Sequence, residues 1–307
     1  MKKIYFLAIV AFATILLILF VFYNRYRAYY EDEKIDSYIS KNIDILNDNL
    51  NFEKQYALSL SLFISKNKTI QKALHVKNQS MALKEIDKFL KEIKNSTGID
   101  NIDIQVHTKN LEAFARNWDK SDYLGLKLAG FRKGLVEVKK SKKSLVSIEL
   151  GKRLNIKAIS PILDKNQNFI GSIEIIMDFK NIEKRLQKFG LKMLPLLDEK
   201  FIDIAVYIKN NQKIDRYFIT EKKYSQELYQ KLENNLYVFD KSKFYYEIGS
   251  KIIVFVPMLS VGIQDVGFIV LSMDAKQDVV YNYPQVDIER ENSDYQFNNK
   301  RRKVVIK

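Results

Sequence analysis

Cysteine is missing from this 307-residue chain, which also has only two histidines, four prolines and ten glycines. Without thiols the chain forms no disulfide and holds no Cys-ligated zinc or iron–sulfur cluster. The phosphate-loop, dinucleotide-binding, hydrolase and zinc-protease patterns are missing as well. His75 and His107 stand far apart, and we interpret His107, on a predicted strand, as a partly buried structural residue. These absences predict a protein that is not an enzyme and that needs no metal or cofactor.

The charge balance is strongly positive, with 51 Lys+Arg against 37 Asp+Glu and a formal net charge of +14. Such a charge can attract nucleic acid or anionic lipid. The lysines are nevertheless spread along the chain, apart from "KKSKK" (139–143) and "NKRRK" (299–303). No nucleic-acid-binding pattern occurs, so we expect no nucleic-acid partner. A membrane-anchored nucleic-acid binder that uses the basic tail is the less favoured alternative.

The longest apolar run is "IYFLAIVAFATILLILFVFY", which carries no charge from Ile4 to Tyr23. About 20 apolar residues in a helix span the roughly 30 Å of a bilayer core. The following "NRYRAYYEDE" offers no small-residue cleavage site, which argues against a signal peptide. The sequence therefore predicts an uncleaved transmembrane anchor over residues 1–27, with residues 4–23 in the membrane.

The charges that flank this run bear on its orientation. Lys2 and Lys3 favour a cytoplasmic amino terminus, although Arg25 and Arg27 on the other side oppose it. No second span is expected, because the best later window, residues 251–273, is interrupted by proline and polar residues. We therefore predict a single-pass protein of the inner membrane, with the bulk of the chain in the periplasm.

Residues 28–94 are predicted to be helical. No glycine or proline occurs between Tyr29 and Leu62, and apolar residues recur at helical spacing. The spaced positions are Ile35, Tyr38, Ile39, Ile43, Leu46 and Leu50. This pattern predicts one long stalk helix, followed by a connecting helix over 81–93 that ends before a left-handed Gly98.

Beyond the helices the apolar period changes to that of strands. The predicted strands cover 102–108, 144–150, 156–163, 169–179, 201–209, 236–240, 244–249, 251–259 and 266–274. A helix over 181–193 ends before Pro195, which we interpret as part of a linker between two modules. A short helix is expected near 222–235.

An internal repeat supports two copies of one module. Pro161, Gly171, Met177 and Asp178 follow the pattern P-x9-G-x5-M-D, which recurs 96 positions later at Pro257, Gly267, Met273 and Asp274. Prolines and glycines are so scarce here that coincidence is improbable. We predict an α+β fold in which a long N-terminal helix carries two antiparallel-sheet modules, over residues 95–194 and 195–275. Residues 276–307 form a polar tail.

Three short elements, R-x-W-D, G-F-R-x-G-L and S-I-E-x-G-K-R, occur in this order between Ile104 and Phe179. The stretches that contain them are "IQVHTKNLEAFARNWDKSDYLGLKLAGFRKGL" and "SIELGKRLNIKAISPILDKNQNFIGSIEIIMDF". They resemble the double Cache sensory domains of bacterial chemoreceptors and sensor kinases, the double Cache 3 type in particular. The strong match covers about a quarter of the chain, and residues 195–275 fit by position and repeat pattern.

The resemblance implies two PAS-like Cache modules on a long helix, the module over 95–194 being membrane-distal and the one over 195–275 membrane-proximal. It also implies a small-molecule pocket in the distal module. Receptors of this type carry a second membrane span and a cytoplasmic signalling region, whereas Met273 is followed here by the polar tail. An accessory sensor and a truncated chemoreceptor are therefore both consistent with the sequence.

The candidate ligand-binding residues are Arg116, Trp118, Asp119, Tyr123, Phe131, Arg132 and Glu149. An arginine fork pairs with a carboxylate or phosphate, and a tryptophan supplies a flat apolar wall. Asp119 accepts from an amine, positions Arg116 or caps the turn before Tyr123. The alternatives are that Trp118 is core and that Arg132 and Glu149 form an internal salt bridge.

Strand alternation places Ser147 and Glu149 on one face, which is either the solvent side or the pocket side. The three basic residues nearby, Lys152, Arg153 and Lys157, are interpreted as solvated or in contact with a helix. If they lie beside the pocket, they favour an anionic ligand.

The sequence thus predicts a membrane-anchored extracytoplasmic sensor, most simply a homodimer. It binds a small anionic or zwitterionic solute in the distal module and signals through the stalk helix or through a partner receptor or sensor kinase. The alternative is a non-enzymatic envelope scaffold or accessory protein without a small ligand, in which the apolar stripe of residues 29–62 is a dimer seam.

Overall fold

One helix, α1 (Lys2–Ser65), forms the first part of the chain. The computed structural model describes residues 2–118, 123–261 and 263–275, so Asp119 and the predicted tail 276–307 lie outside the described residues. The large apolar side chains from Phe12 to Tyr23 on α1 are at least half exposed. Among the helices of the described residues, none is both long and apolar enough to cross a membrane.

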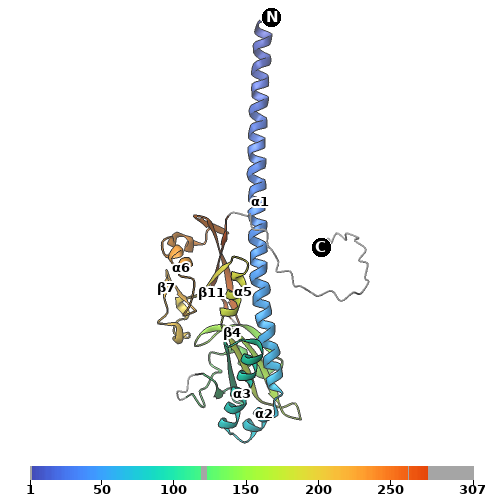
Figure 1. Ribbon diagram of the computed structural model, residues 1–307, viewed down its shortest axis with the longest axis vertical. Helices are drawn as coiled ribbons and strands as arrows, with labels where there is room; N and C mark the ends of the chain where they lie inside the picture. The colour runs from blue at the N-terminus through green and yellow to red at the C-terminus, as the bar shows by residue number, and fades with distance from the viewer. Residues whose placement is uncertain (1, 119–122, 262, 276–307) are drawn as a thin grey trace, which may run out of the picture. The chain divides into compact units, whose positions relative to one another are not determined.

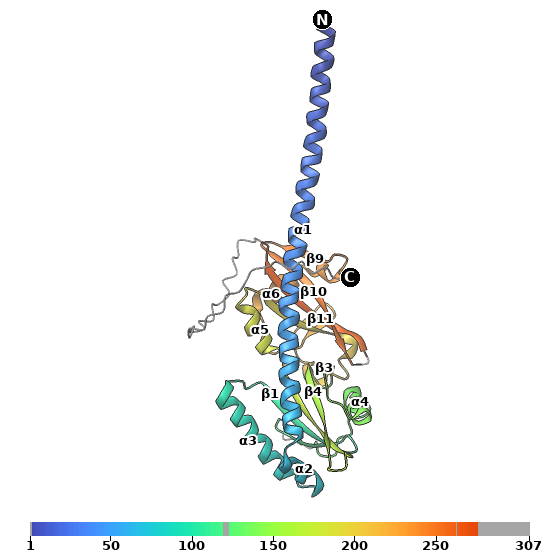
Figure 2. The same cartoon turned by 90° about the vertical axis from the view of Figure 1, so that its right-hand side faces the viewer.

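The second half of α1 packs along the strands and helix α5 (Lys180–Gln187) of the rest of the chain (Figure 2). Its buried positions fall every three or four residues, the period of one helix face. They are Ile39, Asn42, Leu46, Leu50, Glu53, Ala57, Ser61 and Ile64, with Ser65 beside the last of them. This face therefore packs on the chain's own core, and the reading of the apolar stripe as a dimer seam is wrong for its buried positions.

Helices α2 (Lys68–His75) and α3 (Gln79–Thr97) follow at the end of α1 (Figure 1). The side chains of Asn67 and Asn78 accept from the main-chain N–H three residues on and cap the two helices. The predicted connecting helix lies within α3, and Gly98 ends it at φ +70° as expected.

The first sheet contains β1 to β5 in the antiparallel order β2-β1-β5-β4-β3. Its strands are β1 (Ile102–Thr108), β2 (Ala113–Arg116), β3 (Leu145–Leu150), β4 (Leu154–Leu163) and β5 (Phe169–Met177). The four strands predicted here are confirmed. Strand β2 and helix α4 (Lys133–Ser141) were not predicted, because both are short and lie in a polar segment.

The second sheet contains β6 to β11, with the order β9-β10-β11-β6-β8-β7. Its strands are β6 (Lys192–Asp198), β7 (Lys213–Ile214), β8 (Tyr217–Ile219), β9 (Tyr245–Ile248), β10 (Lys251–Ser260) and β11 (Ile263–Asp274). Helix α6 (Gln226–Glu233) covers part of the helix predicted near 222–235. The two sheets meet at one strand pair, Ser260 with Ile148, beside which Leu150 N donates to Ser260 Oγ at 3.1 Å.

The helix predicted over 181–193 is shorter than expected, because α5 ends at Gln187 and residues 192–193 belong to β6. Three further predictions in the second half are wrong. Pro195 belongs to no linker but lies within β6, where it pairs with Ile269 of β11. The predicted strand 201–209 is replaced by the 3₁₀ turns Glu199–Phe201 and Val206–Ile208, because the side chain of Asp198 caps the chain and turns it. The predicted strand 236–240 is the 3₁₀ turn Leu236–Asp240.

The repeat corresponds to one hairpin built twice. In β4–β5 Ile162 pairs with Gly171, and in β10–β11 the residue 96 positions later, Met258, pairs with Gly267. A Cβ at either glycine would collide with a main-chain oxygen of the neighbouring strand, so only glycine allows the approach. Both sheets also pair the second strand of this hairpin with their own first strand, β1 or β6.

Candidate ligand-binding site

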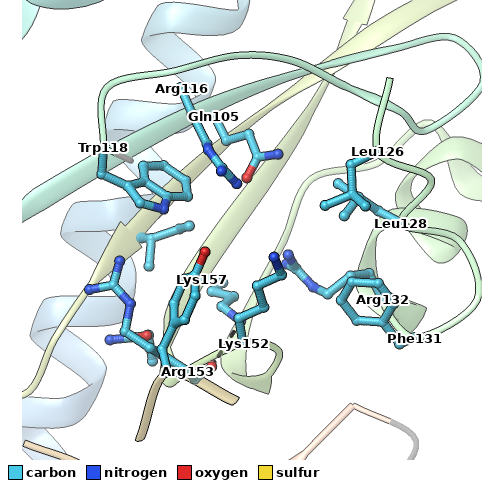
Figure 3. Close-up of a pocket in the computed structure, with 13 residues that line it drawn as sticks. Gln105, Arg116, Trp118, Leu126, Leu128, Phe131, Arg132, Lys152, Arg153 and Lys157 are labelled. Carbon is cyan, nitrogen blue, oxygen red and sulfur yellow. Dashed lines mark hydrogen bonds between the residues drawn. The ribbon is translucent and has the colours of Figure 1, made fainter. Parts of the chain in front are cut away.

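A small cavity lies on the face of the first sheet that points away from α1 (Figure 3). Successive side chains of β4 point to opposite faces of the sheet. Ser160 bonds to Ser61 of α1, so the even-numbered side chains face α1, whereas the odd-numbered Asn155 and Lys157 line the cavity on the other face. The lining residues are Gln105, Arg116, Trp118, Leu126, Leu128, Phe131, Arg132, Lys152, Arg153, Asn155, Lys157, Ile176 and Tyr207. The cavity volume is about 50 Å³.

The lining is cationic. Five of its described residues are arginine or lysine, namely Arg116, Arg132, Lys152, Arg153 and Lys157, and none is a carboxylate. In Figure 3 Trp118 and Arg116 form one side of the cavity and Leu126, Leu128 and Phe131 the other. A small space with apolar walls and several cations in its lining suits an anionic group, because burial strengthens the attraction between opposite charges.

Arg116 is positioned by aromatic rings. Its guanidinium lies 4.1 Å from the ring centroid of Tyr123 and 5.5 Å from that of Trp118. The Tyr123 hydroxyl also accepts from the main-chain N–H of Arg116 at 3.2 Å and from Gln79 Nε2 at 3.0 Å. Tyr123 therefore supports the cavity from behind, whereas the half-buried Trp118 lines it and is not a core residue.

Arg132 lies in a buried ion network. It pairs with Glu149 through Nε and Oε1 at 3.2 Å and also with Glu174, whose Oε2 lies 3.6 Å from His107 Nε2. Burial alone would raise the pKa of Glu174, but Arg132, His107 and Lys157 together hold this pKa below its ordinary value. Glu149 does not line the cavity. The internal salt bridge between Arg132 and Glu149, considered from the sequence, is therefore present.

Lys157 is almost fully buried, with 3% of its surface exposed, so its interpretation as a solvated residue is wrong. Burial, followed by the nearby Arg132 charge, lowers its pKa to about 7. Arg153 pairs with Asp103 at 3.1 Å, and Lys152 Nζ lies 5.2 Å from the Tyr207 ring centroid. The basic residues thus lie beside the cavity, which is the arrangement that we expected to favour an anionic ligand.

Two polar residues of the cavity escaped the sequence analysis. Gln105 and Asn155 are each only 4% exposed, and Gln105 Nε2 and Asn155 Oδ1 have no hydrogen-bond partner among the described residues. Buried polar atoms are normally paired, so these two atoms point to a bound solute or water. The available signal was the alternation of "IDIQVHT", which places Gln105 with Asp103 and His107 on a polar strand face, opposite Ile104 and Val106.

A family model described as the double sensory domain of two-component sensor kinases matches residues 33–279. The chain belongs to this family, dCache_3. The resemblance seen in the sequence is thereby confirmed, and the match extends over both sheets of this double Cache chain. No curated protein matches the sequence.

Three solved sensory domains are similar to this chain at low identity. The sensor domain of the Vibrio cholerae histidine kinase DctB has 12% identity and a TM-score of 0.45, over 78% of this chain and 96% of that domain. The ligand-binding domain of the Pseudomonas fluorescens chemoreceptor CtaA, solved with L-serine, has 12% identity and a TM-score of 0.44, over 80% and 99%. That of the Campylobacter jejuni chemoreceptor Tlp3, solved with L-valine, has 11% identity and a TM-score of 0.41, over 80% and 96%.

The candidate residues of this double Cache chain thus divide into three groups. Arg116, Trp118, Phe131 and Arg132 line the cavity. Tyr123 and Glu149 hold Arg116 and Arg132 from behind. Asp119 lies outside the described residues. Among all the residues that the structure describes, no group of three or more histidine, aspartate or glutamate side chains is placed to hold a metal ion.

Proposed function

We propose that this chain is an extracytoplasmic sensor, not an enzyme, that binds a small organic anion in the cavity of the first sheet. The observation that carries the proposal is the cationic lining without a described carboxylate. Arg116 is the main contact for the anion, since a planar guanidinium fork matches a carboxylate. Gln105 Nε2 offers an unpaired donor to the anion, and Asn155 Oδ1 accepts from a hydroxyl or ammonium group elsewhere on the ligand. Trp118 and Phe131 cover its apolar part.

The size of the cavity restricts the ligand. About 50 Å³ is room for a few water molecules, which need roughly 10–15 Å³ each. A ligand larger than a few heavy atoms therefore enters only if lining side chains move aside. A zwitterionic amino acid would in addition need an acceptor for its ammonium group, and Asp119 is the residue proposed for that role.

We also propose that the uncharged run of residues 4–23 anchors the chain in the inner membrane. The exposed apolar side chains on this part of α1 support an apolar environment for it, because water would not be a favourable solvent for so many of them. If this is correct, the chain remains in the membrane fraction after an alkaline wash and residues beyond 27 are digested by protease added to spheroplasts. Release by the wash would disprove the anchor.

Signal transmission is proposed to run through α1. Residues 28–94 would form the stalk and connecting helices, 95–194 the membrane-distal module, 195–275 the proximal one and 276–307 a polar tail. The cavity and α1 lie on opposite faces of the first sheet. A ligand that binds one geometry of this sheet more tightly than another therefore favours the position of α1 that goes with that geometry. We propose that the chain acts as a homodimer and that it passes the signal to a partner receptor or sensor kinase.

The test is a thermal-shift and calorimetric screen of the full-length chain against small organic acids, with amino acids as a second panel. A binding acid stabilises by RT ln(1+[L]/Kd), about 2.7 kcal/mol at 100-fold Kd. We expect a hit whose affinity falls at least tenfold in Arg116→Gln.

The matched control is Arg216→Gln, which removes the same charge from a side chain that is 55% exposed on the second sheet. Its affinity should equal that of the wild type. A hit that both variants leave unchanged would place the site elsewhere. A broad panel without any hit would favour the scaffold alternative.

A further inference from the structure

One buried lysine in the lining of the cavity has donors to spare. Lys157 lines the cavity (Figure 3) and is only 3% exposed, and its Nζ lies against the β3–β4 turn, where it donates to Arg153 O at 3.4 Å. Within the described part of the chain this is its only hydrogen bond, and no carboxylate forms an ion pair with it. An ammonium group has three donors and its hydrogen bonds are usually about 2.7–3.2 Å long, so this one bond satisfies it poorly.

The two carboxylates nearest to Lys157 are held by Arg132 instead. Arg132 Nε and Nη2 donate to the two oxygens of Glu149 at 3.2 and 3.4 Å, and Nη1 donates to Glu174 Oε2 at 3.3 Å. Glu174 also faces His107, which is neutral at pH 7 because burial lowers its pKa to about 4. One guanidinium thus joins both carboxylates, and Lys157 is left beside the cavity without an anion of its own.

These surroundings place Lys157 between two protonation states. Burial, followed by the charge of Arg132, lowers its pKa to about 7, and Arg153 of the β3–β4 turn acts in the same direction. The carboxylates of β3 and β5 oppose the shift but do not cancel it. A negative charge added in the cavity would favour the protonated form, because opposite charges attract strongly where water is excluded.

We propose that Lys157 takes up one proton from the solvent when a small organic anion enters the cavity, and that this uptake makes the site select anions over neutral molecules. The inference rests on the anion binding proposed above and adds to it the residue that detects the charge. In this step the neutral amine gains a proton from water or buffer and becomes an ammonium group, while the ligand remains an ionised carboxylate.

A second buried donor supports the same selectivity. Gln105 Nε2 also belongs to the lining and has no hydrogen-bond partner among the described residues. A carboxylate has about four lone-pair sites on two oxygens, so it can accept from Gln105 and from Lys157 together. A neutral ligand brings no charge that would offset the cost of burying an ammonium group, so Lys157 stays an amine when such a ligand binds.

Proton uptake is measured on the full-length wild-type chain, so the main readout needs no substitution. Acetate, propionate and butyrate are titrated calorimetrically at pH 8 in Tris and in triethanolamine, two cationic buffers with different ionisation enthalpies. The difference between the two apparent binding enthalpies gives the number of protons taken up. We expect a value close to one for each acid that binds, because about nine-tenths of the Lys157 side chains are neutral at pH 8 before binding.

The pH dependence of the affinity is a second readout. Below pH 7 Lys157 is protonated with or without the anion, so the affinity should be constant there. Between pH 7 and pH 9 binding requires the uptake of a proton, so the affinity should fall as the pH rises, by up to about tenfold per pH unit. His107 does not account for such a trend, since its pKa of about 4 lies far below this range.

The variant Lys157→Met removes the amine and keeps a side chain of similar length. It should bind acetate at least tenfold more weakly than the wild type at pH 7, without proton uptake and without a pH trend. The matched control is Lys213→Met, which removes a lysine that is 42% exposed on the second sheet and should behave as the wild type. Acetamide, the neutral counterpart of acetate, should bind the wild type at least tenfold more weakly than acetate and without proton uptake.

The outcomes separate this inference from the proposed function. If none of the three acids binds the wild type, both are wrong. If an acid binds with the same enthalpy in the two buffers and with constant affinity from pH 7 to pH 9, anion binding stands and the role of Lys157 is disproved. Proton uptake that persists in Lys157→Met, or acetamide that binds as tightly as acetate, would also overturn it.

Discussion

The two sheets of this chain share a hairpin and a strand order but fill the equivalent face differently. The strand pairings align the positions: Lys157, Ser172 and Glu174 of the first sheet correspond, 96 residues on, to Ile253, Phe268 and Val270 of the second. Through the same pairings Gln105 and His107 correspond to Leu194 and Leu196. Every one of these polar residues of the first sheet is thus replaced by an apolar one.

The apolar replacements belong to one hydrophobic cluster with the rings of Tyr217 and Phe239. The ring of Phe268 is 5.7 Å from that of Tyr217, and Lys241 Nζ lies 3.9 Å from the Phe268 centroid while it donates to the Tyr217 hydroxyl at 2.9 Å. The second sheet therefore packs its own side chains where the first sheet buries charges and surrounds a cavity. The repeated glycine allows the strands to approach, the repeated methionine lies in the core, and the residues between them distinguish the two faces.

The largest effect that tests this comparison is expected from Glu174→Ala, set against Val270→Ala at the corresponding position. Loss of Glu174 leaves Arg132, His107 and Lys157 buried without their shared carboxylate, and such losses cost about 3–5 kcal/mol. Loss of two methyl groups at Val270 should cost about 2 kcal/mol. Urea unfolding of both variants gives the two free energies. If Glu174→Ala proves the milder change, the ion network does not hold the first sheet together.

A smaller effect concerns the pH dependence of stability, compared between the wild type and Lys157→Met. The pKa of Lys157 is lowered from 10.5 to about 7 on folding. Below pH 7 Lys157 is protonated in both states, so the cost of burying its charge is constant. Between pH 7 and 10 the unfolded chain binds the extra proton, so this cost is relieved as the pH rises, by up to about 1.4 kcal/mol per unit.

The advantage of Lys157→Met over the wild type in free energy of unfolding should therefore shrink between pH 7 and pH 9. Denaturation at several pH values measures the difference, and the second sheet supplies the control, because Ile253→Met at the corresponding position should show no such trend. A difference that stays constant over this range would mean that Lys157 remains charged in the folded protein.

The sequence was informative where one local rule dominated. The spacing of Pro161 and Gly171 located a hairpin whose backbone geometry depends on those residue types, and helix and strand periods located most elements of the first sheet. Prediction failed where a local rule was overridden. Pro195 reads as a breaker, yet β6 pairs on both sides, and the apolar alternation of 201–209 was defeated by the capping turn at Asp198.

The site was predicted less completely than the fold. Arg116, Trp118, Phe131 and Arg132 were chosen for their side-chain chemistry within the stretch that resembles sensory domains, and they do line the cavity. Lys157 was misread and Asn155 was missed because lysine and asparagine usually lie at the surface, and only the packed structure shows that they are buried. Burial of a polar residue is a tertiary fact, which a single strand pattern cannot contain.

The narrow junction between the sheets has a mechanical consequence. At the strands the two sheets are joined by the Ser260–Ile148 pair and by the hydrogen bond from Leu150 N to Ser260 Oγ. Helix α1 bonds to the first sheet through Ser61 and to the second through Asn42. Any movement of one sheet against the other must therefore also shift or bend α1.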